Sequence, residues 1–147
     1  MQPDITDKYI LLVDDNLDDI HLLSKPPPGN CQAEVFATTS GEEAIDLLVR
    51  ENFIPSLVVM EIDLPSGDGY GLLRFIRQHH DLHTVPVVIL TGTLALENID
   101  PAWLMGANAV ILKPASPEEM SDLVKSLCEV WLHFSIAPRP LVVAQLA

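Results

Sequence analysis

The sequence predicts an α/β fold, in which a five-stranded parallel sheet carries helices on both faces. Short apolar runs alternate with segments of helical periodicity five times along the chain. The runs are continuously apolar, as expected of strands that are buried on both faces of a sheet. Because crossovers between parallel strands are right-handed, this alternation predicts a doubly wound α/β domain.

Length and net charge indicate a one-domain protein and exclude some classes of binding partner. The chain has 147 residues, of which 48% are hydrophobic, so it is long enough for one domain with a substantial core. It carries 8 basic and 21 acidic residues and a formal charge of −13. This charge repels phosphate backbones and anionic lipid, so we expect no direct nucleic-acid binding. Basic proteins, basic peptides or a divalent cation are the expected partners.

Neither a membrane span nor a secretory signal is expected. No apolar run approaches the roughly eighteen residues that a spanning helix needs. The N-terminal residues MQPDITDKY lack the basic and apolar regions of a signal peptide. Cys31 and Cys128 stand alone in the sequence, which is typical of a reducing compartment. We therefore expect a cytoplasmic protein.

Five apolar runs are the candidate strands. The first ends abruptly in Asp14 and Asp15, and each of the others is bounded by polar residues, glycine or proline. The runs are Tyr9–Val13, Ala33–Ala37, Ser56–Met60, Val85–Leu90 and Ala109–Leu112.

Helical periodicity fills the intervals between the strands. The first helix is predicted over Leu17–Leu23 and is stopped by the prolines at 26–28. Ser40 and the two residues that follow Gly41, Glu42 and Glu43, are predicted to open the second helix. The third helix is predicted over Gly71–Gln78.

Proline punctuates the last two helices and the tail. Asp100 is predicted to be the N-cap of the fourth helix and Pro101 its first residue, with Leu94–Ile99 forming a separate turn or a kinked start. Ser116 and Pro117 open the fifth helix in the same way. Residues 135–147 are either a frayed terminus or a segment that docks on its own domain or on a second subunit.

Polar residues follow four of the predicted strands. Asp14 and Asp15 follow the first, Glu61 the third, Thr91 the fourth and Lys113 the fifth. Singly, each pattern is ordinary, since an Asp pair after a strand is usually turn or capping chemistry. Together they predict a site at the carboxyl edge of the sheet, where doubly wound folds bind their ligands.

With these residues the sequence resembles the receiver domain of two-component response regulators, the chemotaxis-regulator (CheY-like) family. The resemblance covers residues 8–134, which leaves 135–147 as a C-terminal tail, and it implies a flavodoxin-like (βα)5 fold. The spacings agree too, with 30 residues from Glu61 to Thr91 and 52 to Lys113. The matching residues are Asp14-Asp15, Leu64-Pro65, Asp68-Gly69, Thr91, Gly106-Ala107 and Lys113-Pro114.

The resemblance assigns a role to each residue of the predicted site. In that family the acidic pair holds Mg²⁺, and an Asp at the end of the third strand takes a phosphoryl group from a sensor histidine kinase. Thr91 would bind a phosphoryl oxygen, and Lys113 would pair with the phosphorylated carboxylate. A weakly bound Mg²⁺ would take its ligands from Asp14, Asp15, Glu61 and Asp63.

The chain departs from the family at the phospho-acceptor position. The acceptor Asp lies four residues before the proline, and here that residue is Glu61. Its carboxylate stands one methylene further out, and about 1 Å of misplacement can cost about a hundredfold in rate. We therefore expect a single-domain response regulator that is not an enzyme and signals through protein contacts without phosphorylation. Val110 likewise replaces the aromatic switch residue that is usual three positions before the lysine.

The sequence also allows two other functions. A conventional Mg²⁺-dependent receiver would use another acid, either Asp63 or Asp15. A metal-dependent phosphohydrolase would need Asp-x-Asp after the first strand, where the chain has Asp14-Asp15-Asn16.

The expected partners are a sensor histidine kinase or a downstream signalling protein. The family resemblance places such contacts, and a homodimer interface, on the fourth helix, fifth strand and fifth helix. Separately, His79 and His83 have the i, i+4 spacing of a metal-binding pair near the end of the third helix. A solvated last turn, in which cationic side chains suit the helix dipole, explains the same pattern.

Overall fold

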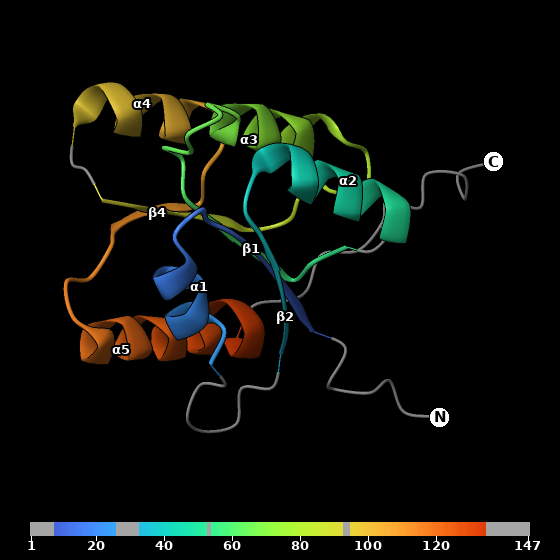
Figure 1. Ribbon diagram of the computed structural model, residues 1–147. Helices are drawn as coiled ribbons and strands as arrows, with labels where there is room; N and C mark the ends of the chain where they lie inside the picture. The colour runs from blue at the N-terminus through green and yellow to red at the C-terminus, as the bar shows by residue number, and fades with distance from the viewer. Residues whose placement is uncertain (1–7, 26–32, 53, 93–94, 135–147) are drawn as a thin grey trace, which may run out of the picture.

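The computed structural model describes residues 8–25, 33–52, 54–92 and 95–134. Its five strands form one parallel sheet in the order β2-β1-β3-β4-β5, which confirms the predicted architecture (Figure 1). The strand order reverses between β1 and β3, at the centre of the sheet. The strands are β1 (Tyr9–Val13), β2 (Glu34–Thr38), β3 (Leu57–Met60), β4 (Val87–Thr91) and β5 (Ala109–Leu112).

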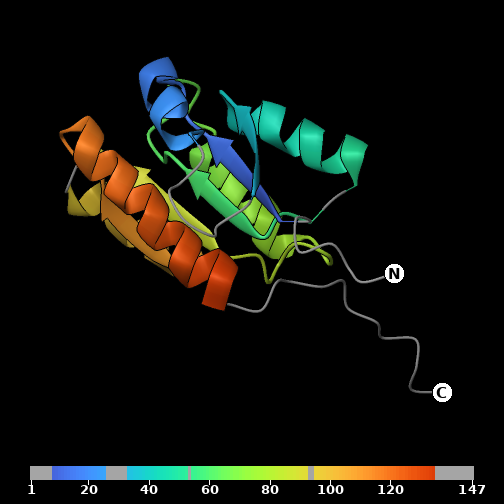
Figure 2. The same cartoon turned by 90° about the horizontal axis from the view of Figure 1, so that it is seen from below.

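Helices cover both faces of this sheet. In Figure 1, α1 and α5 lie below the sheet, and α2, α3 and α4 lie above it. Figure 2, seen from below, shows α5 running along the lower face of the sheet. A π-helical segment, η1 (Cys128–Phe134), continues α5. The α-helices are α1 (Leu17–Leu23), α2 (Gly41–Glu51), α3 (Gly69–Gln78), α4 (Leu96–Leu104) and α5 (Pro117–Leu127). None of the described helices is long and apolar enough to span a bilayer.

Two apolar clusters hold the layers together, one on each face. Alternate residues of a strand point to opposite faces, so β1 supplies Leu11 to one cluster and Leu12 to the other. Leu11 packs with Leu72 and Ile76 of α3. Leu12 packs with Leu23 of α1 and with the buried residues of α5 and η1.

Serine caps begin two helices where the sequence predicts them. Ser40 accepts a hydrogen bond from the Glu43 backbone N–H, and Ser116 accepts one from the Glu119 backbone N–H. Pro117 is the first residue of α5, where its missing N–H costs nothing. The first helix also has its predicted bounds, although the prolines at 26–28 lie outside the described residues.

The prediction for the fourth helix is wrong at its start. Asp100 is not an N-cap, because α4 already begins at Leu96 and Pro101 lies inside it. The backbone N–H of Ile99 donates to the Ala95 carbonyl, so the turn before the proline is helical. Proline is costly in a helix interior because it removes one hydrogen bond. Here Ala102, which follows it, is fully buried against the sheet, and this packing favours the helix.

The β3–α3 loop is pressed against the start of α2. Asp68 Oδ2 accepts a 2.9 Å hydrogen bond from the Glu42 backbone N–H. A Cβ at position 41 would lie 2.6 Å from the Asp68 carbonyl oxygen, so glycine is required there. Burial pushes the pKa of Asp68 upward, but hydrogen bonds from Glu42, Ser66 and Gly41 outweigh it and lower the pKa below its usual value. Asp68 is therefore a charged cap supplied by another element.

We expect Asp68→Ala to lower the free energy of unfolding by about 1 kcal/mol at pH 7, since it removes a cap next to a helix N-terminus. The pKa of Asp68 is lowered in the folded state, so this contribution is present above the ordinary Asp pKa of about 3.9. It is lost as the pH falls through the lowered folded value. Urea unfolding at neutral pH and at a series of acidic pH values measures the contribution and its loss.

Ser40→Ala is the matched control for this prediction. It removes a neutral cap from the same helix, with a similar cost of about 1 kcal/mol. Its destabilisation should not depend on pH over the range in which Asp68 titrates. A pH-independent loss for Asp68→Ala would contradict the charged cap.

Candidate functional site

The carboxyl edge of the sheet brings together side chains from distant parts of the chain. Asp14 directly follows β1, Glu61 directly follows β3, and Lys113 directly follows β5. Backbone hydrogen bonds extend the sheet to these positions: Glu61 N–H donates to the Val13 carbonyl, and Lys113 N–H donates to the Thr91 carbonyl. The parallel sheet therefore fixes where each of these side chains starts.

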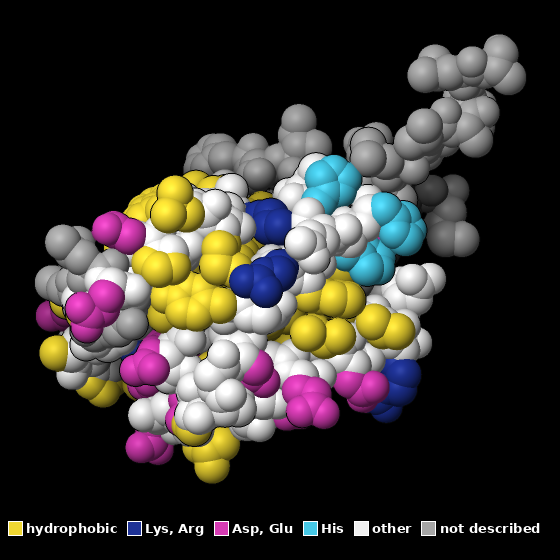
Figure 3. Space-filling view, turned by 90° about the horizontal axis from the view of Figure 1, so that it is seen from above, with side chains coloured by type: hydrophobic (Ala, Val, Ile, Leu, Met, Phe, Trp, Pro, Cys, Tyr) yellow, Lys and Arg dark blue, Asp and Glu magenta, His cyan; other side chains and the backbone are white. Residues whose placement is uncertain are grey.

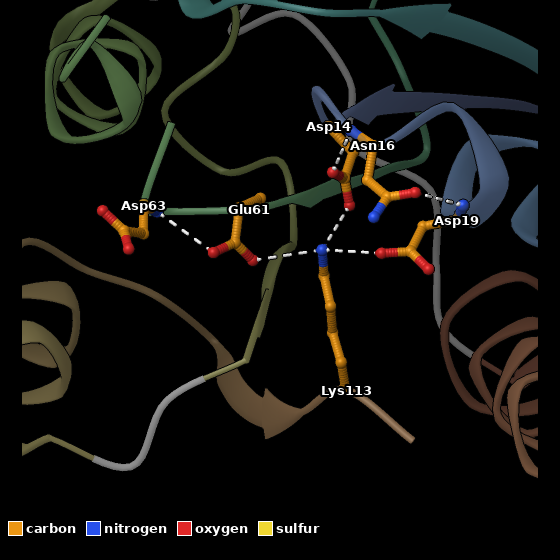
Figure 4. A network of polar contacts seen from close by, with 6 residues as sticks. All are labelled: Asp14, Asn16, Asp19, Glu61, Asp63 and Lys113. Atoms are coloured by element: carbon orange, nitrogen blue, oxygen red, sulfur yellow. Dashed lines mark hydrogen bonds and ion pairs between the residues drawn. The ribbon is translucent and has the colours of Figure 1, made fainter. Parts of the chain in front are cut away.

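Lys113 is the centre of a four-residue ionic network (Figure 4). Its Nζ lies 2.8 Å from Asp14 Oδ2, 2.9 Å from Asp19 Oδ2 and 3.5 Å from Glu61 Oε2. The side chain of Lys113 is 16% exposed and that of Asp14 is 2% exposed. One ammonium thus faces three carboxylates in a pocket that is largely closed to water.

Glu61 occupies the middle of the pocket. Its side chain is 8% exposed. Oε1 accepts a 3.3 Å hydrogen bond from the Asp63 backbone N–H. Oε2 faces Lys113 and, within the described part of the chain, has no hydrogen-bond donor. The carboxylate is therefore ion-paired at one oxygen and hydrogen-bonded at the other.

Burial and pairing shift the pKa of Glu61 and of Lys113 upward for different reasons. Burial raises the pKa of Glu61, because the 3.5 Å separation from Lys113 gives too little attraction to offset desolvation. Burial opposes the charge of Lys113 as well, but its hydrogen bonds to Asp14 and Asp19 outweigh this and raise its pKa. Lys113 is thus held mainly by the two aspartates, and Glu61 is the weakest partner.

The structure places the other predicted site residues at different depths. Thr91 is the last residue of β4 and is buried. Asp15 is exposed next to the buried Asp14. Asp63 is also exposed, and Figure 4 shows its carboxylate pointing away from Lys113. Asp14, Glu61 and Lys113 therefore come together as predicted, whereas the carboxylate of Asp63 does not join them.

Asp19 is a member of the network that was not predicted from the sequence. It lies in the first turn of α1, where an acidic residue is already explained by its favourable interaction with the helix dipole. Two local hydrogen bonds bring it to the pocket: Asp14 Oδ1 accepts from the Asn16 backbone N–H, and Asn16 Oδ1 accepts from the Asp19 backbone N–H. The only hint in the sequence is its distance of five residues from Asp14.

We expect Lys113→Met to lower the free energy of unfolding by about 3 kcal/mol at pH 7. It leaves three carboxylates facing one another, and removing one partner of a buried ion pair typically costs about 3–5 kcal/mol. The raised pKa of Lys113 means that its stabilisation is complete below the ordinary lysine pKa of about 10.4 and is lost only above it. Denaturant unfolding measures the loss.

A second variant separates charge from packing in this prediction. Adding Glu61→Gln to Lys113→Met removes one of the three negative charges at almost constant volume. Part of the lost stability should return. No recovery in the double variant would mean that the cost of Lys113→Met comes from packing of the lysine stem.

Comparison with known proteins identifies the class. The family model of the response regulator receiver domain matches residues 10–125, which is most of the chain. The chain therefore belongs to the response regulator receiver family. The fold and the acidic pocket at the carboxyl edge agree with this assignment.

Two solved structures and one curated protein are among the relatives of this chain. The crystal structure of the Mn²⁺-bound form of response regulator Rcp1 is 27% identical, with a TM-score of 0.79, and the match covers 89% of this chain and 99% of that one. The phosphorylated cyanobacterial phytochrome response regulator RcpA is 28% identical, with a TM-score of 0.82, covering 89% and 98%. A probable transcriptional regulator, ycf27 of Cyanophora paradoxa, is 31% identical over 124 residues, or 84% of this chain and 49% of its own length. The chain thus spans about half of this curated relative.

Proposed function

We propose that this chain is a receiver of a two-component pathway that signals without aspartyl phosphorylation and is not an enzyme. The observation that carries the proposal is the buried carboxylate of Glu61 at the phospho-acceptor position. Its extra methylene places the carboxylate further from β3 than an aspartate would reach. Nucleophilic attack on a phosphoryl donor depends on that distance.

Glu61 instead imitates part of the phosphorylated state. One of its oxygens accepts from the Asp63 backbone N–H and the other faces the Lys113 ammonium. A phosphoryl group would need donors of the same kind, but it carries between about 1.5 and 2 negative charges, whereas a carboxylate carries one. Glu61 therefore supplies a permanent but weaker version of the signal.

The pocket suits a divalent cation, but only weakly. Its donors are carboxylate oxygens, which hard cations such as Mg²⁺ prefer, and Glu61 Oε2 is buried without a hydrogen-bond donor among the described residues. Asp14, Asp15 and Glu61 would hold the ion, and Asp63 would join only if its side chain turned inward. Lys113 already neutralises Asp14 at 2.8 Å, so a cation has to compete with it.

Signalling would pass through protein contacts on α4, β5 and α5. Exposed apolar side chains mark this surface, with Leu104 87% exposed on α4 and Leu112 46% exposed on β5. A sensor histidine kinase, a downstream signalling protein or a second copy of the chain are the partners that we propose for it.

Intact-mass measurement after incubation with acetyl phosphate and Mg²⁺ tests the proposal. We expect no adduct with the mass of one phosphoryl group. A stoichiometric adduct would refute phosphorylation independence, and mapping it to Asp63 or Asp15 would identify a conventional receiver with a displaced acceptor. Turnover of a generic phosphoester under the same conditions would instead indicate a hydrolase.

A further inference from the structure

The segment that links α3 to β4 carries a second group of metal-ligating side chains. His79, His80 and Asp81 follow the last residue of α3, and one ligand atom from each lies within 4.8 Å of the other two. Figure 3 shows histidine side chains gathered at one end of the face formed by the upper helices. The pairing differs from the i, i+4 pair of His79 and His83, since here the two ligating histidines are adjacent.

The contacts around Asp81 hold these ligands close together. Asp81 Oδ2 lies 3.2 Å from His80 Nε2, and the Asp81 backbone N–H donates to His79 Nδ1 at 3.1 Å. The two imidazole rings stack at a centroid distance of 4.7 Å with an interplanar angle of 15°. His83 is engaged differently, because its Nδ1 contacts the His80 carbonyl oxygen at 3.0 Å. The lone pair of His79 Nδ1 therefore faces the Asp81 backbone N–H, and the Asp81 carboxylate contacts His80, so that all three residues are already close together.

We propose that His79, His80 and Asp81 form a site for a borderline divalent metal ion such as Zn²⁺. Two imidazole nitrogens and one carboxylate oxygen are a ligand set typical of Zn²⁺, Ni²⁺, Co²⁺ and Cu²⁺, whereas Mg²⁺ prefers oxygen ligands alone. Binding replaces the hydrogen bond from Asp81 N–H to His79 and the contact between His80 Nε2 and Asp81 Oδ2, and side-chain rotation brings the three ligand atoms closer than their present separations of up to 4.8 Å. A hollow lined by Leu48, Asn52 and Ile54 adjoins His79 and Asp81 and leaves room for water at the remaining positions.

This site is separate from the acidic pocket. The segment precedes β4, whereas Thr91 ends β4 at the opposite edge of the sheet. Five residues of strand span about 16 Å, so the two sites share no ligand. Mg²⁺ at the acidic pocket and Zn²⁺ at the histidine site can therefore be told apart by competition.

Titration calorimetry of the full chain with Zn²⁺ in excess Mg²⁺ tests the site. We expect one Zn²⁺ per chain, not displaced by Mg²⁺. His80→Ala should weaken binding by about tenfold or more, because even outer-shell partners of a metal site are commonly worth tenfold or more. Asp81→Asn should also weaken it. Both positions are on the surface segment after α3, and thermal unfolding of the apo variants checks that they fold.

His83→Ala and His21→Ala are the matched controls, the first from the same segment and the second from α1. Both should bind Zn²⁺ within about twofold of the unchanged chain, a difference below about 0.5 kcal/mol. The proposal is overturned if no Zn²⁺ binds, if Mg²⁺ displaces it, or if His80→Ala binds as well as the unchanged chain. Loss of binding in His83→Ala comparable to that in His80→Ala would overturn it in favour of the i, i+4 pair.

Discussion

Incubation of the Glu61→Asp variant with acetyl phosphate and Mg²⁺ should yield a phosphorylated chain, whereas the unchanged chain should stay unmodified. Shortening the side chain by one methylene withdraws the carboxylate towards β3 and opens the space between it and Lys113. An incoming phosphoryl group can then occupy the position that the Glu61 carboxylate fills now. A correction of about 1 Å at a reacting atom is worth about a hundredfold in rate. Intact mass over time measures the gain.

Glu61→Gln is the matched control for this experiment. It keeps the length of Glu61 and removes its charge, so it should not be phosphorylated. Failure of Glu61→Asp to take up phosphate would show that the rest of the pocket no longer supports the transfer. The Asp19 contact to Lys113 and the valine at position 110 are then the features to reverse next.

Arg77→Met should lower the free energy of unfolding by about 3 kcal/mol or more, the largest loss that we expect from a residue outside the acidic pocket. The Arg77 guanidinium donates to the Val85 carbonyl at 2.7 Å, to the Gly106 carbonyl at 2.7 Å and to Asn108 Oδ1 at 2.7 Å. Removing the guanidinium leaves the part-buried Val85 and Gly106 carbonyls without this donor, and each such acceptor costs about 1–3 kcal/mol, whereas Asn108 Oδ1 keeps the Val87 N–H. Urea denaturation measures the change.

Arg74→Met on the same helix is the control, because Arg74 is exposed and should cost less than about 0.5 kcal/mol. Arg77→Lys should recover only part of the stability, since one ammonium cannot reproduce a fork of five donors. If Arg77→Met lowered the free energy of unfolding as little as Arg74→Met, water would have to supply the hydrogen bonds that the acceptors lose with the guanidinium.

The central strands β3 and β4 were the most predictable because they are buried on both faces. Continuous apolar runs mark such strands, and β1, β3 and β5 agree with their predicted ranges to within one residue. The ends of β4 differ by one or two residues, since Val85 and Pro86 are apolar but precede the ladder. The start of α4 was missed because Pro101 carries the stronger local signal, and the packing of Ala102 against the sheet cannot be read from neighbouring residues.

The pocket was predictable only for residues that end strands. Parallel strands place Asp14, Glu61 and Lys113 at one edge of the sheet, and this placement does not depend on how the helices pack. Asp19 comes from a helix, and its approach to Lys113 depends on the turn that Asn16 makes. For the histidines, sequence spacing pairs His79 with His83, whereas in the structure α3 ends at Gln78 and the ring of His79 stacks on that of the adjacent His80.

Arg77 had no recognisable signal. Near the end of a helix it reads as a surface cation that suits the helix dipole. Its acceptors are backbone carbonyls and one amide from residues up to 31 positions away, and no carboxylate is among them. Such contacts depend on the path of the chain between α4 and β5, including Gly106 with its φ of 98°.

Because of these contacts, the C-terminal end of α4 is held by more hydrogen bonds from other parts of the chain than its N-terminal end. Arg77 ties the turn after Leu104 to α3 through the Gly106 carbonyl, and the Ala107 N–H donates back to the Ala102 carbonyl. At its other end α4 starts after Ala95, which offers no side-chain cap, and Pro101 interrupts its hydrogen-bond ladder. We therefore expect the end of α4 near Arg77 to stay in place and the end that begins after Ala95, four residues from Thr91, to move more readily. A change of charge or ligand in the acidic pocket would then tilt α4 rather than translate it along its axis.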